Sequence, residues 1–589
     1  MASNSNNSKT RLPIQEPAWW KEIFCYQIYP SSFKDSNGDG VGDLKGITAK
    51  VDYLKDLGVD MIWLCPLYKS PMVDMGYDIS DYREIHAPFG TMQDWEELVA
   101  ALKARGMKLI HDLVVNHTSD QHQWFQESKS SKDSPYRDYY IWRPGKTDTS
   151  GRRIPPNNWR SIWGNGSAWE YDETTDEYYL HLFSPQQPDL NFTSPALMEE
   201  IKDMMRFWLN KGISGFRLDA INFVSKPMDF PDAPIQDPSS EYQPAFSLFN
   251  HGPKIHEILQ ELQRDVLSKY DAFTVGEAAF TSPEQAVSYV RQDREDKEMQ
   301  MIFHTEHVDL YGGFEEGPQE ARDYVKLANV ISKWQTYMLN HDSWQSVFLS
   351  NHDQPRPINN ILQAKISQRE EAAKLLCLFL CTQAGTLYCY QGEEVGMVNV
   401  PEDWPLEEYK DLVSQDYFRE RQKELQAKTG EAHPDMTEVR KAINRKARDN
   451  ARTPMPWDSS PKAGFTTGTP WMRVNEDNQV CNVADQQGKK DSILTFWKET
   501  VQLRKSTPTL IYGQFELNLD ERYPTIISYT RELDDKRYLF IANFGGEAVA
   551  VNASTYGATP ESTLVHHTLG SNEPGEGELV AYEARLYRL

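Results

Sequence analysis

The chain repeats one pattern eight times: a short apolar run typical of a buried strand, followed in most cases by an amphipathic stretch typical of a helix. The helical stretches, "TAKVDYLKDLG" among them, end in glycine, which is common just past a helix C-terminus. Because parallel strands need such crossovers, the alternation predicts an α/β fold, a closed (β/α)8 (TIM) barrel with helices outside. The strand-like runs cover residues 23–30, 59–67, 108–117, 215–221, 273–278, 301–307, 346–353 and 385–394.

Three segments depart from this alternation. One, rich in Trp, Pro, Gly, Asn and Ser, follows the third strand and predicts an inserted domain. A charged, helical insertion follows the eighth strand, at roughly 395–460. Near the C-terminus, short alternating strands such as "TIISYTREL" predict an antiparallel β-sandwich. The predicted units are a disordered polar tail (1–16), the barrel (17–116 and 190–514), the inserted domain (117–189) and the sandwich (515–589).

Charge and cysteine content narrow the function classes. The chain has 62 basic and 87 acidic residues, a formal charge of −25, which disfavours nucleic acid and acidic membranes as partners. The N-terminal segment is polar and lacks the apolar core of a signal peptide, and no later run reaches membrane-spanning length, so we expect a cytoplasmic protein. Six cysteines are sparse for 589 residues, and we expect free thiols. The sequence makes no prediction about the oligomeric state.

Ionisable residues gather where the predicted strands end. Active sites of parallel barrels form at the C-terminal ends of the strands. A single charged residue there is more often structural, but its recurrence on several strands favours a functional site. The residues concerned are Asn116 and His117 on the third strand, Arg217 and Asp219 on the fourth, Glu277 on the fifth, His352 and Asp353 on the seventh, and Asp74, Tyr77 and Asp78 in the loop after the second.

The fourth strand, "GFRLDAI", places an arginine beside an aspartate. Alternation assigns Phe216, Leu218 and Ala220 to one face and Arg217 and Asp219 to the other. We therefore expect Arg217 to orient the Asp219 carboxylate and to lower its pKa through the opposite charge.

Four segments, "DLVVNH", "GFRLDAI", "VGEA" and "SNHDQPR", occur in an order and spacing that resemble the four conserved regions of the α-amylase superfamily of glycoside hydrolases. The resemblance extends over nearly the whole chain. "QPDLNF" and "RDNARTPMPW" are similar to the α-glucosidase and oligo-α-glucosidase branch of that family. The resemblance implies retaining hydrolysis, in which one carboxylate is the nucleophile and a second carboxyl group is the acid and then the base.

The resemblance also implies a role for each matching residue. Asp219 would be the nucleophile, Glu277 the acid/base and Asp353 the third carboxylate, which binds sugar hydroxyls. A pocket closed at the non-reducing end would make the enzyme exo-acting, which disfavours an endo-amylase. Arg452, four residues after Arg448, is an alternative for the arginine that reaches the sugar. The residues implied to bind substrate are Asp74, Tyr77, His117, Phe183, Gln187, Arg217, His352 and Arg448.

The resemblance also implies that linkage preference follows the residue after the nucleophile, which is Ala220 in this sequence. In the similar branch, valine there accompanies α-1,6 preference, whereas alanine, threonine or glycine accompany α-1,4 preference. The sequence thus favours a maltase-type α-glucosidase that acts on maltose and short malto-oligosaccharides, with sucrose as a further candidate. Alternatives are an oligo-1,6-glucosidase (isomaltase), a transglycosylase or isomerase on the same scaffold and, more remotely, a non-catalytic module like transporter heavy chains, which tend to lose these carboxylates.

The loop "DSNGDGVGD" presents oxygen ligands at alternating positions, as calcium loops do. It is not a full EF-hand, because Gly46 stands where the bidentate glutamate belongs. A metal-free Asp/Gly turn is the alternative. Relatives in the similar branch bind a structural calcium ion at this loop, so we expect calcium here and no catalytic cofactor. The candidate ligands are Asp35, Asn37, Asp39, the Val41 carbonyl and Asp43.

Overall fold

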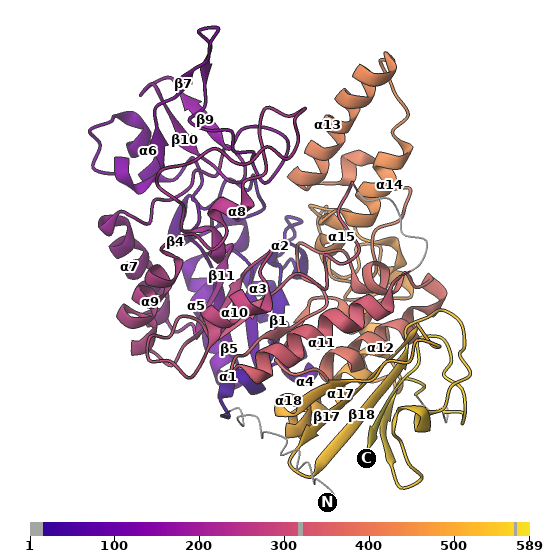
Figure 1. Cartoon of the computed structure of the whole chain (residues 1–589). Helices are drawn as coiled ribbons and strands as arrows, with labels where there is room; N and C mark the ends of the chain where they lie inside the picture. Colours follow the sequence, from indigo (N-terminus) through magenta and orange to yellow (C-terminus); the bar gives the residue numbers. More distant parts are fainter. Residues whose placement is uncertain (1–15, 316–321, 571–573) are drawn as a thin grey trace, which may run out of the picture.

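The computed structural model describes residues 16–315, 322–570 and 574–589 (Figure 1). The predicted disordered tail, apart from residue 16, lies outside the described residues. Eight parallel strands form the central sheet, and each lies within one of the predicted runs. They are β1 (Phe24–Ile28), β2 (Met61–Leu64), β5 (Lys108–Val114), β11 (Gly215–Asp219), β12 (Phe273–Glu277), β13 (Met301–Phe303), β14 (Ser346–Val347) and β15 (Thr386–Tyr390).

The sheet curls into the predicted barrel. Its strand order is β13-β12-β11-β5-β2-β1-β15-β14, which places β13 and β14 at the two ends. These ends meet, because the Ser346 hydroxyl donates a hydrogen bond of 2.9 Å to the Ile302 carbonyl. A side chain thus links the two ends of the barrel.

Amphipathic helices cover the barrel, as α7 (Pro195–Lys211) illustrates. Ser194 caps its N-terminus, and the chain leaves the helix at Gly212, whose φ of 112° favours glycine. Its buried residues include Leu197, Ile201 and Trp208, which recur at helical spacing and pack into the main core. The other long covering helices are α5 (Met92–Ala104), α9 (Ile255–Asp265), α11 (Tyr324–Asn340), α12 (Arg369–Cys381) and α17 (Ile493–Lys505). In the described part of the chain, no helix is long and apolar enough to span a membrane.

Two insertions stand over the C-terminal edge of the barrel (Figure 1). The first lies between β5 and α7 and contains α6 (Gln123–Ser130), the three-stranded sheet β6-β10-β9 and the small β7–β8 hairpin. Its aromatic core also takes in Phe230 and Phe249, so the loop after β11 packs against it. The second consists mainly of α13 (Leu412–Thr429) and α14 (Thr437–Lys446). The strand bounds of the first insertion are β6 (Trp142–Arg143), β7 (Lys146–Thr147), β8 (Arg153–Ile154), β9 (Trp169–Asp172) and β10 (Glu177–Leu180).

The C-terminal region is antiparallel, as predicted, and its hydrogen-bonded strands form one five-stranded sheet of order β16-β17-β18-β20-β19. Alternation along β18 sends Phe540 towards the barrel core and Leu539 and Ile541 into a separate outer cluster. The outer cluster is covered by the segment around Val551 and Tyr556, which takes the place of a second full sheet. The strands are β16 (Gln514–Leu517), β17 (Ile526–Leu533), β18 (Lys536–Asn543), β19 (Thr563–His567) and β20 (Ala584–Arg588).

A buried arginine ties this sheet to the barrel. Arg531 of β17 is 1% exposed, and its guanidinium donates to the carbonyls of Thr382 (2.5 Å), Leu510 (2.9 Å) and Gly513 (2.7 Å). Thr382 lies at the end of α12, just before β15. One side chain therefore satisfies three backbone acceptors from two separate segments, the end of α12 and the short helical segment at 508–513.

Replacing Arg531 with the apolar methionine should leave these carbonyls buried without a donor. We expect Arg531→Met to lower the free energy of unfolding by about 3 kcal/mol, measured by urea denaturation. Arg537→Met on the neighbouring β18, whose arginine side chain is 44% exposed and makes only long ion pairs, is the matched control. Equal stability of the two variants would contradict the anchoring role of Arg531.

Candidate active site

A pocket of about 240 Å³ lies at the C-terminal edge of the barrel, between the two insertions. Its lining includes the sequence-predicted Asp74, Tyr77, His117, Phe183, Asp219, Ala220, Glu277, Asp353 and Arg448. Two further lining residues, Trp163 from the first insertion and Val413 from α13, were not predicted. Neither follows a barrel strand, so no signal in the strand pattern identifies them.

Arg217 is the centre of the charge arrangement. It is 1% exposed, and its guanidinium lies 2.5 Å from Asp219, 2.8 Å from Asp112 and 2.9 Å from Glu277. Arg217 pairs in register with Asp112 of β5, and Glu277 ends the other neighbouring strand, β12. The guanidinium also lies 5.1 Å from the ring of Trp63. Three carboxylates from three adjacent strands thus share one cation.

Asp112 was not predicted as a site residue, although it stands in the motif "DLVVNH". The available signal was its position, since the third and fourth strands of a parallel barrel are neighbours and an arginine on one needs a partner on the other. Burial raises the pKa of Asp112 to about 6 against the opposing effect of Arg217.

The expected direction of the Asp219 pKa shift was wrong. Burial raises the pKa of Asp219 well above its ordinary range, and the negative charges of Glu277 and Asp112 add to that effect. Arg217 opposes the shift, as expected, but one guanidinium cannot offset burial and two carboxylates.

Ala220 departs from the strand alternation expected for it. Its backbone is left-handed, with φ 42° and ψ 37°, so the chain turns directly after Asp219. The turn brings Ala220 to the pocket wall instead of the face shared by Phe216 and Leu218. Its backbone N–H donates a hydrogen bond of 3.1 Å to Glu277. The unusual backbone therefore helps to position the second carboxyl group.

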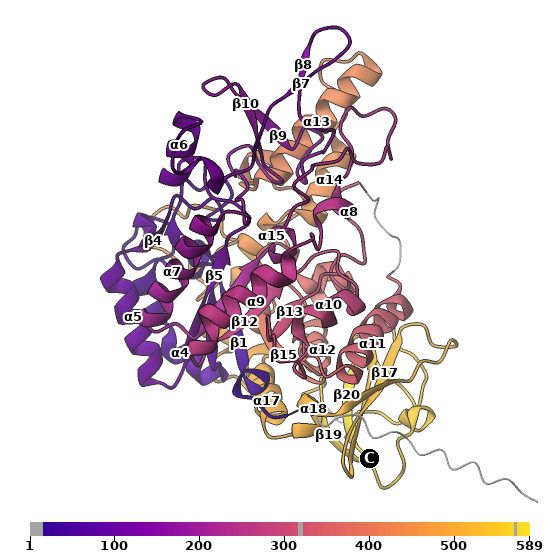
Figure 2. The same cartoon turned by 60° about the vertical axis from the view of Figure 1, so that its left-hand side comes forward.

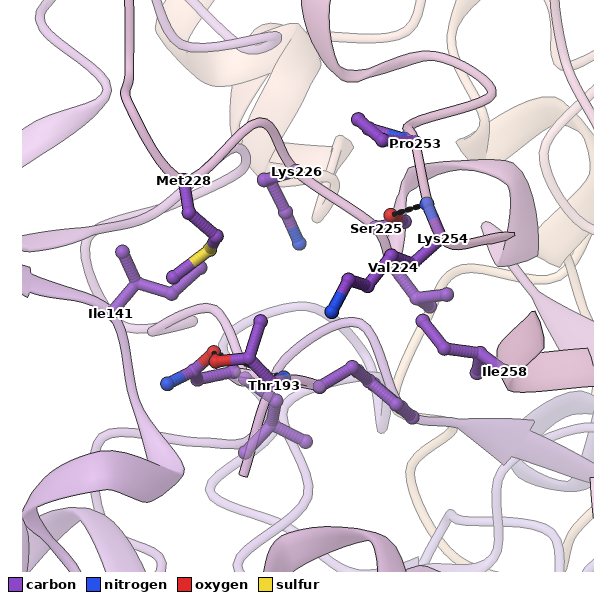
Figure 3. Close-up of a pocket in the computed structure, with 12 residues that line it drawn as sticks. Ile141, Thr193, Val224, Ser225, Lys226, Met228, Pro253, Lys254 and Ile258 are labelled. Carbon is purple, nitrogen blue, oxygen red and sulfur yellow. Dashed lines mark hydrogen bonds between the residues drawn. The ribbon is translucent and has the colours of Figure 1, made fainter. Parts of the chain in front are cut away.

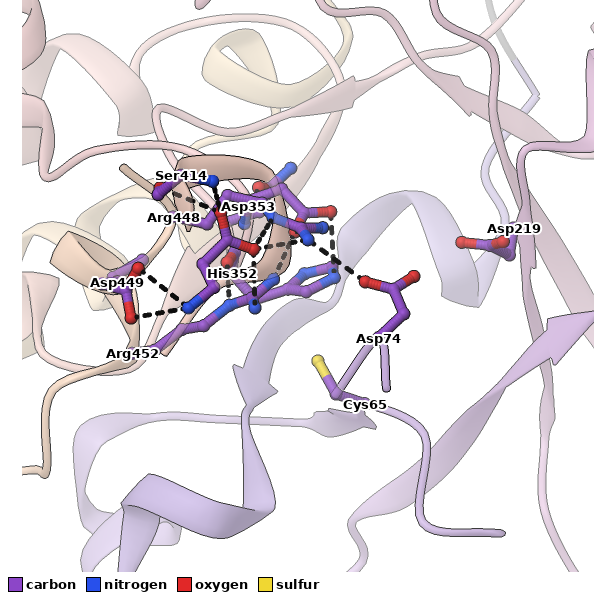
Figure 4. A network of polar contacts seen from close by, with 12 residues as sticks. Cys65, Asp74, Asp219, His352, Asp353, Ser414, Arg448, Asp449 and Arg452 are labelled. Carbon is purple, nitrogen blue, oxygen red and sulfur yellow. Dashed lines mark hydrogen bonds and ion pairs between the residues drawn. The ribbon is translucent and has the colours of Figure 1, made fainter. Parts of the chain in front are cut away.

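Asp353 has the opposite environment from Asp219 (Figure 4). One of its oxygens lies 2.7 Å from Arg452 and 3.2 Å from Arg448, and the other lies 3.2 Å from His352. Burial alone would raise the pKa of Asp353, but His352 and the two arginines together hold it well below its usual range. This carboxylate is ionised at any ordinary working pH.

Of the two candidate arginines, Arg448 reaches the pocket. It bridges Asp74 (3.1 Å), Asp353 (3.2 Å) and Asp411 (2.6 Å). Arg452 is 1% exposed and donates to the backbone carbonyl of His352 at 3.0 Å, so it supports Asp353 from beneath. Asp411, which sequence reasoning missed, caps the N-terminus of α13 and thereby couples that helix to the pocket.

At the end of the pocket predicted to be closed, a buried side-chain amide, that of Gln187, contacts two of the lining residues. The Gln187 side-chain nitrogen lies 3.0 Å from Asp74 and 3.1 Å from His117 Nε2. Gln187 is fully buried and does not line the pocket, so it holds its neighbours from behind. Burial raises the pKa of Asp74 to about 7 and lowers the pKa of His117 to about 3. His117 is therefore a neutral imidazole near pH 7.

Aromatic rings complete the walls. Tyr77 stacks on His352 with ring centroids 5.1 Å apart, and burial lowers the pKa of His352 to about 3. Phe183 contacts both His117 (5.2 Å) and Trp163 (5.1 Å). These rings bring the first insertion into contact with the strand ends.

A second cavity, of about 210 Å³, lies behind the loop that follows β11 (Figure 3). Its walls are mostly apolar, and none of the predicted site residues lines it. Lys226 borders this cavity, and its buried ammonium pairs with Asp189 and donates to Asn116, both at 2.7 Å. Through Asn116 this pair supports the backbone that carries His117.

The candidate calcium loop is closed by its own hydrogen bonds. The Asp35 carboxylate accepts from the backbone of Asn37 (2.8 Å), Gly38 (2.7 Å) and Gly40 (2.9 Å), and Asp43 accepts from Gly46 (2.7 Å). The donor set, with oxygens at alternate positions, suits a hard cation. No cluster of three His, Cys, Asp or Glu with metal-binding geometry occurs in the described ranges, and calcium stays a prediction. All six cysteines are buried and free, as expected.

Comparison with known proteins places this geometry in context. The model of the alpha amylase catalytic domain matches residues 27–513. The chain is 46% identical to an oligo-1,6-glucosidase of Parageobacillus thermoglucosidasius, over 98% of this chain and 99% of the relative. It is 45% identical to an alpha-glucosidase of Schizosaccharomyces pombe, over 91% and 92% of the two chains.

Solved structures of related enzymes have the same fold as this chain. A trehalose-6-phosphate hydrolase of Bacillus licheniformis superposes with a TM-score of 0.87 at 37% identity, covering 97% of this chain and all of that chain. A trehalulose synthase, described in complex with its substrate sucrose, superposes with a TM-score of 0.86 at 38% identity and the same coverage. With the barrel, the pocket and the carboxylates at the strand ends in place, the chain belongs to the alpha-amylase family of glycoside hydrolases, and its relatives lie in the glucosidase branch.

Proposed function

We propose that this enzyme is a retaining, exo-acting α-glucosidase of the maltase type, which releases α-glucose from the non-reducing end of maltose and short malto-oligosaccharides. One observation supports this most directly: ion pairs among Asp74, Arg448 and Asp353 cross one end of the pocket, while Asp219 and Glu277 line it as well. A pocket bridged at that end accepts a terminal sugar and leaves no passage for a continuing chain.

Arg217 supports the retaining mechanism. Retaining enzymes need their two carboxyl groups about 5–5.5 Å apart, and here both contact neighbouring nitrogens of one guanidinium. Asp219 attacks the anomeric carbon while Glu277 gives its proton to the departing glycosidic oxygen, which yields a covalent glucosyl-enzyme. Glu277 then takes a proton from water, whose oxygen attacks the same carbon and frees Asp219. Two inversions at that carbon give the α-anomer.

Asp353 would bind sugar hydroxyls and stabilise the positive charge that develops on the ring. The arginines beside it support this role, because they keep the carboxylate ionised and fixed in direction. Neutral His352, whose Nδ1 faces the Gln27 amide, can donate its Nε2–H to a hydroxyl, whereas Nε2 of His117 already lies 3.1 Å from the Tyr77 carbonyl. The resemblance remains the ground for assigning the two histidines to the sugar.

The α-1,4 preference rests on Ala220, whose side chain lies at the pocket wall next to the nucleophile. A small side chain leaves space on the aglycone side, whereas a β-branched one would narrow it. Oligo-1,6-glucosidase is the second candidate, since relatives with that name are 46% identical to the chain. The chain is also similar to a trehalulose synthase that is described in complex with sucrose. Sucrose cleavage and isomerisation are therefore tested as further activities.

The wild-type enzyme should release glucose from maltose faster than from isomaltose at matched concentrations, with sucrose assayed in parallel. The first-formed glucose should be the α-anomer, followed by NMR before mutarotation. Faster glucose release from isomaltose than from maltose would support the oligo-1,6-glucosidase. Formation of rearranged disaccharides would support an isomerase. β-Glucose as the first product would contradict the retaining mechanism.

Ala220→Val should shift the ratio of maltose to isomaltose hydrolysis towards isomaltose by about tenfold, because a methyl-sized change in a pocket is worth about 1–3 kcal/mol. Valine should also lower the stability, because a β-branched side chain tolerates the positive φ of residue 220 less well than alanine does. Ala220→Gly is the matched control, since it tolerates that backbone and adds no bulk, so its ratio should stay near wild type. An unchanged ratio in Ala220→Val would refute the specificity role.

The sharing of Arg217 by three carboxylates leads to a prediction about the pH dependence of activity. Asp219 must be ionised to attack, and its pKa is raised, so kcat/KM should fall as pH drops through a range above that of an ordinary aspartate. Asp112→Asn removes one negative neighbour and should move this acid limb to lower pH. Glu173→Gln, a charge change in an exposed turn of the first insertion, is the control and should leave the limb in place. Coincident profiles for all three proteins would contradict the charge-sharing account.

A further inference from the structure

A glutamine in the barrel interior contacts one of the histidines beside the pocket. Gln27 lies on β1, and Figures 1 and 2 show this strand inside the barrel domain, enclosed by helices. Gln27 is 2% exposed, and its amide nitrogen lies 2.8 Å from Nδ1 of His352. The same nitrogen lies 3.2 Å from Sγ of Cys65, which follows β2. Both hydrogens of the amide group therefore have a partner.

Aromatic rings fix the plane of the His352 imidazole but not the position of its hydrogen. Tyr77 and Tyr29 stack on the imidazole with interplanar angles of 12° and 18°, and Trp63 meets it edge-on at 90°. A stacked ring makes the same contact whichever nitrogen carries the hydrogen, because both N–H bonds lie in the ring plane. Hydrogen bonds within that plane must therefore select the tautomer.

The charge of Asp353 determines which nitrogen of His352 carries the hydrogen. The Asp353 carboxylate is ionised, so it can only accept, and its Oδ2 lies 3.2 Å from Nε2 of His352. A bare Nε2 would turn its lone pair towards that negative charge, whereas Nε2–H is attracted to it. A neutral imidazole has one ring hydrogen, so Nδ1 is then an acceptor. The NH2 end of the Gln27 amide suits such an Nδ1, and its carbonyl end does not.

The tautomer affects the pocket through Asp353, which lines it. The two neighbouring arginines contact Oδ1 of Asp353, whereas Nε2 of His352 lies against Oδ2. Nε2 is buried and makes no hydrogen bond of regular geometry within the described residues, so its hydrogen can also meet a sugar hydroxyl bound to Asp353. A bare Nε2 would repel Oδ2 and would offer that hydroxyl no donor.

We propose that Gln27 is a positioning residue, which holds His352 as the Nε2–H tautomer and thereby keeps a hydrogen-bond donor against the Asp353 carboxylate. The inference deepens the proposed function and rests on it for the role of Asp353. Gln27 does not line the pocket, so it acts through its neighbours and touches no sugar. Its amide does not ionise, so the donor to Nδ1 is present at every working pH.

Gln27→Met keeps most of the side-chain volume and removes the donor to Nδ1. Both tautomers of His352 should then be populated, and kcat/KM for maltose should fall by roughly tenfold, mainly through kcat. Gln335→Met is the matched control. Gln335 is 1% exposed, and its amide makes two hydrogen bonds to the backbone of Ala384, before β15. This control should lose stability and keep the wild-type kcat/KM.

Gln27→Glu should change the pH dependence of kcat/KM. At low pH a proton lies between the introduced carboxyl group and Nδ1, and Nε2–H is kept. As pH rises this proton is lost, and the new carboxylate draws the ring hydrogen to Nδ1, because Asp353 is already paired with two arginines. The variant should therefore lose activity with rising pH at a lower pH than wild type. The other ionisable groups around the site are the same in both proteins; they are Tyr29, Cys65, Tyr77, Arg217, Asp353, Arg448 and Arg452.

NMR of protein labelled with 15N-histidine identifies the tautomer without any activity, and the signal of His352 is assigned by its loss in His352→Asn. In wild type the hydrogen should be on Nε2, and in Gln27→Met the Nδ1–H form should appear as well. An Nδ1–H form in wild type would overturn the inference, even if no variant folds. So would one tautomer common to wild type and Gln27→Met.

The kinetic outcomes test the consequence for the reaction. A changed tautomer in Gln27→Met with unchanged kcat/KM, or coincident pH profiles for wild type and Gln27→Glu, would overturn the positioning role. An equal loss of kcat/KM in Gln335→Met would reduce Gln27 to a structural residue and would overturn it too. A wild type that carries Nε2–H but releases no glucose from maltose would overturn the proposed function alone.

Discussion

The active site depends on one buried guanidinium. Arg217 contacts Asp112, Asp219 and Glu277, which end or occupy three adjacent strands of the barrel. A lone arginine this deeply buried would be costly, and so would three carboxylates without a cation. The barrel register meets both needs, because it places each of the three carboxylates within 3 Å of the Arg217 guanidinium. The same register brings Asp219 and Glu277 onto neighbouring nitrogens of that guanidinium.

The pKa values of the carboxylates in the site differ because the number of arginines beside each carboxylate differs. Asp219 shares Arg217 with two other acids, and burial raises its pKa. Asp353 lies against two arginines, Arg448 and Arg452, and its pKa is lowered. Residues of the same type in one pocket therefore differ in charge behaviour because of their partners. The same arginines extend the network outward, since Arg448 also holds Asp411 at the start of α13.

Strand-end residues were predictable from the sequence because a parallel barrel brings all C-terminal strand ends to one rim. Asp219, Glu277 and Asp353 follow that rule, and all three line the pocket. Trp163 and Val413 do not follow it, since they come from insertions whose placement depends on packing. Gln187 was assigned to the sugar, but it lies behind Asp74 and His117. A motif shows which residues belong to a site and not how deep each side chain lies, and the contact of Gln187 with the sugar stays a prediction.

The sequence by itself determined the barrel, the strands that carry the acids and the family, because hydrophobic periodicity and motif order are local properties of the chain. The tertiary structure decided the direction of the Asp219 pKa shift, since that depends on burial and on charges from neighbouring strands. It also decided the left-handed turn at Ala220, whose N–H reaches Glu277 of the neighbouring strand. That contact joins residues 57 positions apart, and no pattern within either segment specifies it.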